Sequence, residues 1–77
     1  MVIKVLGSGC ANCKRLEEIT RKAVEKIGIA AEIIKVTDYA EMMKYAIMST
    51  PALVIDEKLV SAGRIPTESE ITNWISN

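Results

Sequence analysis

The sequence predicts an α/β sandwich in which three helices flank a four-stranded mixed sheet, with the elements in the order βαβαββα. Three observations lead to this fold class. Short β-branched runs alternate with longer segments in which apolar residues recur every three or four positions. Two of the runs are separated by only a compact polar turn, which predicts an antiparallel hairpin. The first strand–helix–strand unit calls for a right-handed crossover and therefore a parallel strand pair.

The first strand and helix follow from the N-terminal third of the chain. Val2 to Leu6 is a short β-branched-rich run that ends at Gly7-Ser8-Gly9, which predicts a buried strand followed by a tight loop. From Cys13, apolar residues recur three or four positions apart with charged residues between them. This spacing predicts an amphipathic helix of about four turns, and Gly28 supplies its stop.

The middle of the chain predicts a strand, a helix and a break. Ala30 to Val36 is an apolar run of strand length. Asp38 with Glu41 three residues later has the spacing of a capping box, so we expect a second helix from about Tyr39 to Met48. Ser49-Thr50-Pro51 ends this helix, because proline cannot continue it and biases the preceding residue toward extended backbone.

The remaining segments predict the hairpin and the last helix. Ala52 to Ile55 is the third strand, Asp56-Glu57 the turn and Leu59 to Ala62 the fourth strand. Pro66-Thr67 followed by Glu70 is another capping-box pattern. The helix after it has one apolar face, which contains Ile71, Trp74 and Ile75.

Length and charge limit the function classes. At 77 residues the chain has room for one domain, expected over residues 1–77. Ten basic residues balance ten acidic ones without a long block of either sign, which argues against nucleic-acid binding. The apolar N-terminus is too short for a signal peptide, and no stretch has the length of a membrane span. We therefore expect a cytoplasmic monomer.

The two cysteines, Cys10 and Cys13, carry the chemistry that the sequence predicts. A Cys-x-x-Cys pair at the start of a helix brings two sulfurs within bonding reach. The positive helix N-terminus favours thiolate, and Lys14 and Arg15 follow in the next turn. Cys10 ends the glycine-rich loop and should ionise more easily, whereas Cys13 opens the apolar stripe and should be the more buried. Our hypothesis is that Cys10 attacks a substrate disulfide and Cys13 resolves the mixed disulfide.

The two cysteines also suit other kinds of protein. A structural zinc site needs four ligands, and the chain has no histidine and no third cysteine. A Cu(I) carrier remains an alternative, because two thiolates suffice for Cu(I). A redox sensor whose disulfide changes its affinity for a partner, or a docking subunit of a larger redox complex, also remains open. The oxidoreductase needs no bound cofactor.

Two segments together resemble the thioredoxin superfamily, in particular its small archaeal and bacterial redox-active disulfide proteins. They are Gly7-Ser8-Gly9-Cys10-Ala11-Asn12-Cys13 after the first strand and Ser49-Thr50-Pro51-Ala52-Leu53-Val54-Ile55 before the hairpin. The resemblance implies a thioredoxin-like sandwich that reduces protein disulfides, with a thioredoxin-reductase-like flavoprotein as electron donor. It also implies a cis Thr50-Pro51 bond beside Cys10. Thr50, Pro51, Ala11 and Asn12 would then contact the substrate.

The chain also departs from the patterns it resembles. The familiar thioredoxin centre has Trp before the first cysteine and Gly-Pro inside the motif, where this chain has Gly9 and Ala11-Asn12. Glutaredoxins use a Gly-Gly pair and an Asp for glutathione, and the corresponding places here are Ala62-Gly63-Arg64 and Pro66-Thr67. The thioredoxin reduction potential and the glutathione site therefore do not carry over.

Several other side chains are interpreted structurally. Lys4 is taken as a strand lysine that reaches solvent, and Arg64 as an exposed loop arginine. The two tyrosines of the second helix and Trp74 receive no functional role. The methionines of that region are interpreted as core residues: Met42, Met43 and Met48.

Overall fold

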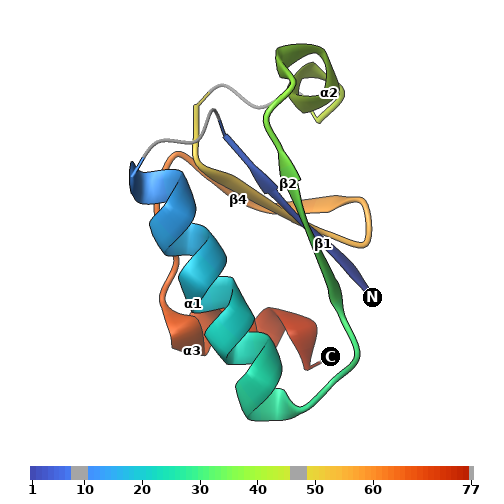
Figure 1. Ribbon diagram of the computed structural model, residues 1–77, viewed down its shortest axis with the longest axis vertical. Coiled ribbons are helices and arrows are strands. Elements are labelled where there is room, and N and C mark those ends of the chain that lie inside the picture. Colours follow the sequence, from blue (N-terminus) through green and yellow to red (C-terminus); the bar gives the residue numbers. More distant parts are fainter. Residues whose placement is uncertain (8–10, 46–48, 77) are drawn as a thin grey trace.

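The computed structural model describes residues 1–7, 11–45 and 49–76, which form a mixed four-stranded sheet and three helices (Figure 1). The predicted fold class and element order are confirmed. In chain order the elements are β1 (Val2–Leu6), α1 (Ala11–Ile27), β2 (Glu32–Val36), α2 (Tyr39–Met43), β3 (Ala52–Ile55), β4 (Lys58–Ala62) and α3 (Glu68–Ile75).

The strand order β2-β1-β3-β4 places β1 inside the sheet. β1 is parallel to β2, as the crossover argument predicts, and antiparallel to β3. Leu6 at the end of β1 pairs with Ala52 at the start of β3. The loop that follows β1 and the loop that precedes β3 therefore leave the sheet at the same end. This register brings together the two segments that the sequence singles out.

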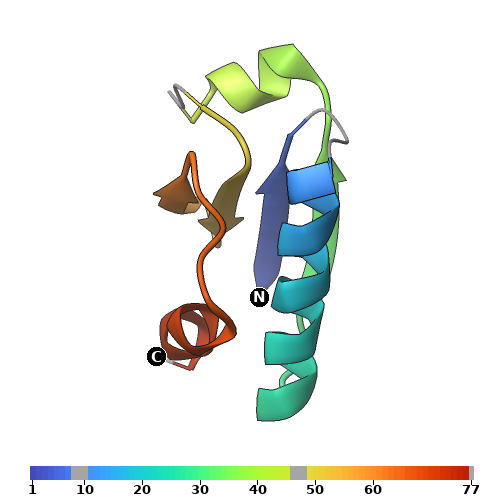
Figure 2. The ribbon, with the colours of Figure 1, turned by 90° about the vertical axis from the view of Figure 1, so that its left-hand side faces the viewer.

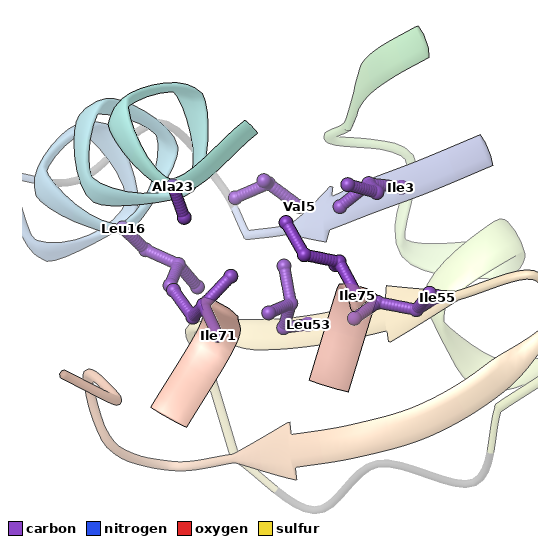
Figure 3. Close-up of a cluster of buried hydrophobic side chains, with 8 residues drawn as sticks. All are labelled: Ile3, Val5, Leu16, Ala23, Leu53, Ile55, Ile71 and Ile75. Atoms are coloured by element: carbon purple, nitrogen blue, oxygen red, sulfur yellow. The ribbon is translucent and has the colours of Figure 1, made fainter. Parts of the chain in front are cut away.

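The sheet buries apolar residues on both faces, because successive strand residues point to opposite sides. On one face, strand residues pack against α1 and α3, which contact each other (Figure 3). A smaller cluster on the other face consists of Leu6, Met42, Ala52 and Val54 and lies under α2. Figure 2 shows α2 across one end of the sheet, away from α3. The larger cluster comprises Ile3, Val5, Leu16, Ala23, Leu53, Ile55, Ile71 and Ile75.

Helix α1 extends over 17 residues and begins at Ala11, two residues before the predicted start. Gly28 adopts a left-handed φ of 76°, and its N–H donates to the Val24 carbonyl at 2.9 Å. This is the glycine stop that the sequence predicts. The buried face of the helix begins at Cys13, so the second cysteine is part of the packed side of α1.

Helix α2 differs from its prediction in length and capping. Asp38 caps it by accepting the Ala40 N–H at 3.1 Å, but the Glu41 carboxylate pairs with Lys44 instead of completing a capping box. The regular helix ends at Met43 because the N–H groups of Lys44 and Tyr45 bond carbonyls only three residues back. The predicted extension to residue 48 was therefore wrong from Lys44 to Tyr45, and residues 46–48 lie outside the described part.

The methionine interpretation holds for one of the two described methionines in this region. Met42 is buried in the cluster under α2. Met43 is 55% exposed, because consecutive residues of a helix point in directions about 100° apart. The core interpretation of Met43 was therefore wrong, and Met48 lies outside the described residues.

The hairpin between β3 and β4 has a two-residue turn in which Asp56 and Glu57 have φ values of 48° and 69°. Two positive φ values in a two-residue hairpin are typical of a type I′ turn. The turn is also tied to β1, since Asp56 N–H donates to the Val2 carbonyl and its carboxylate accepts the Val2 N–H, both at 2.8 Å. Strand β4 begins at Lys58, one residue before its predicted start.

The predicted capping box at α3 is present. Thr67 Oγ1 accepts the Glu70 N–H at 3.1 Å, and Glu70 Oε1 accepts the Thr67 N–H at 3.0 Å. Arg64 adds a two-pronged ion pair, donating to the two carboxylate oxygens at 3.1 and 2.8 Å. The Arg64 guanidinium and then the Thr67 N–H lower the pKa of Glu70 to about 2. Arg64 is therefore a paired residue that fixes the start of α3, rather than only an exposed loop arginine.

Glu70→Gln should remove an acid-sensitive part of the stability. The pKa of Glu70 is lower in the folded chain than its ordinary value of 4.5. Its contribution is therefore complete above about pH 4.5 and is lost as the pH falls toward 2. We expect the wild type to melt at a higher temperature than Glu70→Gln at pH 7, with the difference shrinking toward pH 2. Thermal melts at both pH values, with Glu68→Gln as the matched control, test this; a constant difference would contradict it.

Candidate active site

Helix α1 presents three motif residues in its first turn with very different exposure. Ala11 and Asn12 are exposed, whereas Cys13 is 6% exposed and packs at the start of the helix core face. Cys10, the predicted nucleophile, lies outside the described residues. The structure thus places Cys13 on the buried side of α1, as predicted, with the two intervening residues facing solvent.

The Thr50–Pro51 segment lies at the same end of the sheet as the loop after β1, because Leu6 and Ala52 are cross-strand partners. Its peptide bond is cis. Pro51 is buried and Thr50 is exposed, and the Pro51 carbonyl accepts the Gly63 N–H at 2.9 Å. Gly63 itself has a left-handed φ of 79° and lies against Ser49. The segment before β3 is therefore held on the β4 side by a glycine.

Gly7 provides the space for the Cys13 sulfur, which the sequence reasoning did not anticipate. A Cβ at Gly7 would overlap Cys13 Sγ and lie 3.2 Å from Cys13 Cβ. The Gly7 backbone is fixed, because its N–H donates to the Val36 carbonyl at 3.0 Å and continues the β1–β2 pairing. From the sequence, Gly7 is interpreted only as a turn residue. Its spacing from Cys13 gives no indication of this contact.

A cavity of about 40 Å³ opens beside Cys13, between α1 and the ends of β1 and β2. Such a volume is enough for about one water molecule. Charged side chains of α1 and β2 line the cavity together with apolar and small residues. The lining residues are Val5, Gly7, Cys13, Lys14, Glu17, Lys35 and Thr37.

Glu17 is the carboxylate of this cavity, and it is paired with two cations. It contacts Lys35 Nζ at 3.0 Å and Arg21 at 2.9 Å, and its side chain is 17% exposed. The bond from Lys35 lowers the pKa of Glu17 below its ordinary 4.5. Glu17 is therefore an ion-paired brace that holds α1 to β2.

Positive charge dominates the entrance to α1. The first turn of the helix contains no acidic residue, and Lys14 and Arg15 are exposed there. Lys35 also lies at the cavity next to Cys13, where it is paired with Glu17. Exposed cations at a helix N-terminus are surroundings of the kind that favour thiolate over thiol. Over residues 1–7, 11–45 and 49–76, no group of three or more potential metal-ligating side chains is found.

A polar network on the other face of the sheet escaped the sequence reasoning. Lys4, interpreted as a lysine that reaches solvent, donates to Tyr45 Oη at 2.8 Å and to Glu57 Oε1 at 2.9 Å. These partners are 41 and 53 residues away in the chain, so no local pattern links them.

In the described part of the chain, no helix is long and apolar enough to cross a membrane.

Comparison with known proteins agrees with this architecture. A family model described as a thioredoxin domain matches residues 1–76. A thioredoxin from Methanocaldococcus jannaschii is 42% identical over 71 residues, covering 92% of this chain and 81% of that protein. A thioredoxin from Methanothermobacter thermautotrophicus is 36% identical over 76 residues, covering 99% of both chains. The chain therefore belongs to the thioredoxin family.

Proposed function

We propose that this chain is a thiol–disulfide oxidoreductase that reduces protein disulfides through the Cys10–Cys13 dithiol. The observation that carries the proposal is the burial of Cys13 in the first turn of α1, three residues after Cys10 and at the sheet end where Thr50–Pro51 lies. Two relatives named thioredoxin, aligned over nearly the whole chain, support a redox function of this kind. No observation favours the Cu(I) carrier over it.

The proposed reaction is two successive thiol–disulfide exchanges. The Cys10 thiolate attacks one sulfur of the substrate disulfide, forming a Cys10–substrate disulfide and releasing the other substrate sulfur as thiolate. The Cys13 thiolate then attacks Cys10 Sγ, which forms the Cys10–Cys13 disulfide and releases the second substrate thiolate. Two electrons pass to the substrate. Exposed Lys14 and Arg15 near the start of α1 favour the thiolate forms that both steps require.

Substrate contacts are assigned to four residues beside the dithiol. Exposed Thr50 offers its main chain for pairing with an extended substrate segment, and buried Pro51 holds that backbone in place. Ala11 and Asn12, exposed between the cysteines, form the other border of the site. This combination suits disulfides in accessible, extended segments of other proteins.

The proposed cycle needs an electron donor and a reducing compartment. We assign the donor role to a reductase of the thioredoxin-reductase-like flavoprotein class, which returns the Cys10–Cys13 disulfide to the dithiol. We place the protein in the cytoplasm, because cytosolic redox poise keeps such dithiols reduced. Its working form in this proposal is a monomer without a bound cofactor.

A redox titration tests the proposal. The full chain is equilibrated in graded redox buffers, and free thiols are counted after rapid alkylation. We expect a reversible two-electron transition at or below about −200 mV, the span from glutaredoxins to thioredoxin. If no intramolecular disulfide forms in any buffer, the oxidoreductase proposal is wrong.

A further inference from the structure

The face of the sheet opposite α1 has a closed polar triangle formed by Lys4, Tyr45 and Glu57. Lys4 Nζ donates to Tyr45 Oη at 2.8 Å and to Glu57 Oε1 at 2.9 Å, and Tyr45 Oη donates to Glu57 Oε2 at 2.9 Å. Lys4 Nζ also lies 5.5 Å from the centre of the Tyr45 ring, within cation–π range. Each member is bound to both others, so the tyrosine hydroxyl has one defined position.

Two corners of this triangle belong to firmly held backbone. Lys4 is in β1, which is paired with β2 on one side and β3 on the other. Glu57 is in the β3–β4 turn, whose other residue, Asp56, makes two hydrogen bonds of 2.8 Å to Val2. The third corner, Tyr45, belongs to no regular element and follows the end of α2. The triangle therefore fixes Tyr45 to the sheet, rather than the reverse.

Tyr45 is close in the chain to the proposed substrate-binding residues. It precedes Thr50 by five positions, and its half-buried ring packs against the cluster that contains Ala52, the residue directly after Pro51. The same segment is also held by the bond from Gly63 N–H to the Pro51 carbonyl. Tyr45 and Gly63 are thus two points at which the chain around Thr50–Pro51 is attached to the rest of the fold.

We propose that Tyr45 is a positioning residue for substrate binding: its hydroxyl, held between Lys4 and Glu57, sets the placement of the Thr50–Pro51 backbone. This inference rests on the proposed function, since it assumes that this backbone binds the substrate. Tyr45 does not touch the reacting sulfurs in this scheme, so its loss should weaken binding and leave the chemistry unchanged.

The test uses Tyr45→Phe, which keeps the ring and the Lys4–Glu57 ion pair and removes only the hydroxyl. Tyr39→Phe is the matched control, because Tyr39 is in α2, is 73% exposed and has no hydrogen bond among those found in the described residues. Each variant is assayed with insulin, whose disulfides lie in peptide segments, and with 5,5′-dithiobis(2-nitrobenzoate), a small disulfide without a peptide backbone. Exchange of the Gly63 amide proton, measured by NMR, reports on the Pro51 hydrogen bond without any turnover.

For Tyr45→Phe we expect KM for insulin to rise roughly threefold to tenfold, as the loss of one or two hydrogen bonds implies. kcat and the rate with the small disulfide should stay unchanged, and the Gly63 amide should exchange faster. Tyr39→Phe should match the wild type in all four measurements. Unchanged KM and exchange in Tyr45→Phe would overturn the inference. Equal losses with both disulfides, together with a lower Tm, would also overturn it, because they indicate a stabilising role only.

The same measurements separate this inference from the proposed function. If the wild type reduces neither disulfide, the proposed function fails, and the exchange of the Gly63 amide alone then decides whether Tyr45 positions the Thr50–Pro51 segment. If the wild type reduces both disulfides while Tyr45→Phe behaves like Tyr39→Phe, the proposed function stands and the positioning role is wrong.

Discussion

Cys13→Ser should accumulate a covalent complex with substrate, whereas Cys10→Ser should form none. In the proposed order of steps, Cys10 makes the mixed disulfide and Cys13 resolves it. Without Cys13 the first exchange still occurs, but the intermediate cannot close into the Cys10–Cys13 disulfide. Without Cys10 only the buried Cys13 thiol remains in the first turn of α1, and the rate of disulfide reduction should fall on the order of 10³-fold or more.

Non-reducing electrophoresis and intact-mass measurement after incubation with oxidised insulin check this prediction. The complex of Cys13→Ser should carry the mass of one insulin molecule and disappear on addition of dithiothreitol. Cys10→Ser is the matched variant, because both substitutions replace sulfur by oxygen within one motif. Trapping by Cys10→Ser instead would reverse the roles of the two cysteines, and equal trapping by both would show that burial of Cys13 does not order the steps.

Gly7→Ala should destabilise the fold and slow closure of the disulfide. The added methyl group would overlap Cys13 Sγ, and neither side can easily withdraw: the Gly7 N–H is bonded to the Val36 carbonyl, and Cys13 lies on the packed face of α1. Overpacking of this kind costs about 1 to 3 kcal/mol. For a chain of this size, each kcal/mol lowers Tm by roughly 4 to 8 °C. Displacement of the sulfur should also slow formation of the Cys10–Cys13 disulfide.

A double-mutant cycle assigns the effect to this contact. Gly7→Ala is introduced into the wild type and into Cys13→Ala, and the free energy of unfolding is measured for all four proteins by urea denaturation. Because Cys13→Ala removes the sulfur that the methyl group meets, Gly7→Ala should cost clearly less in that background. Contacting residues typically couple by about 0.5 to 3 kcal/mol. Additive costs would show that Gly7 is needed for another reason.

Local signals were sufficient for much of the fold. The glycine stop of α1 at Gly28, the capping box at Thr67 and the two-residue hairpin depend on residues a few positions apart, and the structure contains all three. The second helix was predicted less well. Its apolar spacing continues past Met43, but the chain turns there and Tyr45 bonds to β1 and the hairpin turn, so tertiary contacts override the local preference.

The candidate site divides in the same way. The motif Cys10-Ala11-Asn12-Cys13 and Thr50-Pro51 could be recognised in the sequence because their chemistry depends on residue type and spacing. The brace between Glu17 and Lys35 could not be predicted, since either residue alone is an ordinary surface charge on its own element. The Gly7–Cys13 contact was equally hidden, because it depends on how α1 packs against the end of β1.

The sequence by itself determined the order of the elements, the glycine stop of α1, the capping box of α3 and the hairpin turn, because each of these is encoded over a few neighbouring residues. It also predicts the redox pair, from residue type and spacing. Only the tertiary structure decided that β1 lies between β2 and β3, and that Leu6 pairs with Ala52. That register brings the end of β1 next to Thr50–Pro51, although 43 residues separate Leu6 from Thr50 in the chain, and it also joins Lys4 to Tyr45 and Glu57. Such contacts arise from the competition among all possible strand pairings for the most complete burial of both sheet faces, which no local window of sequence contains.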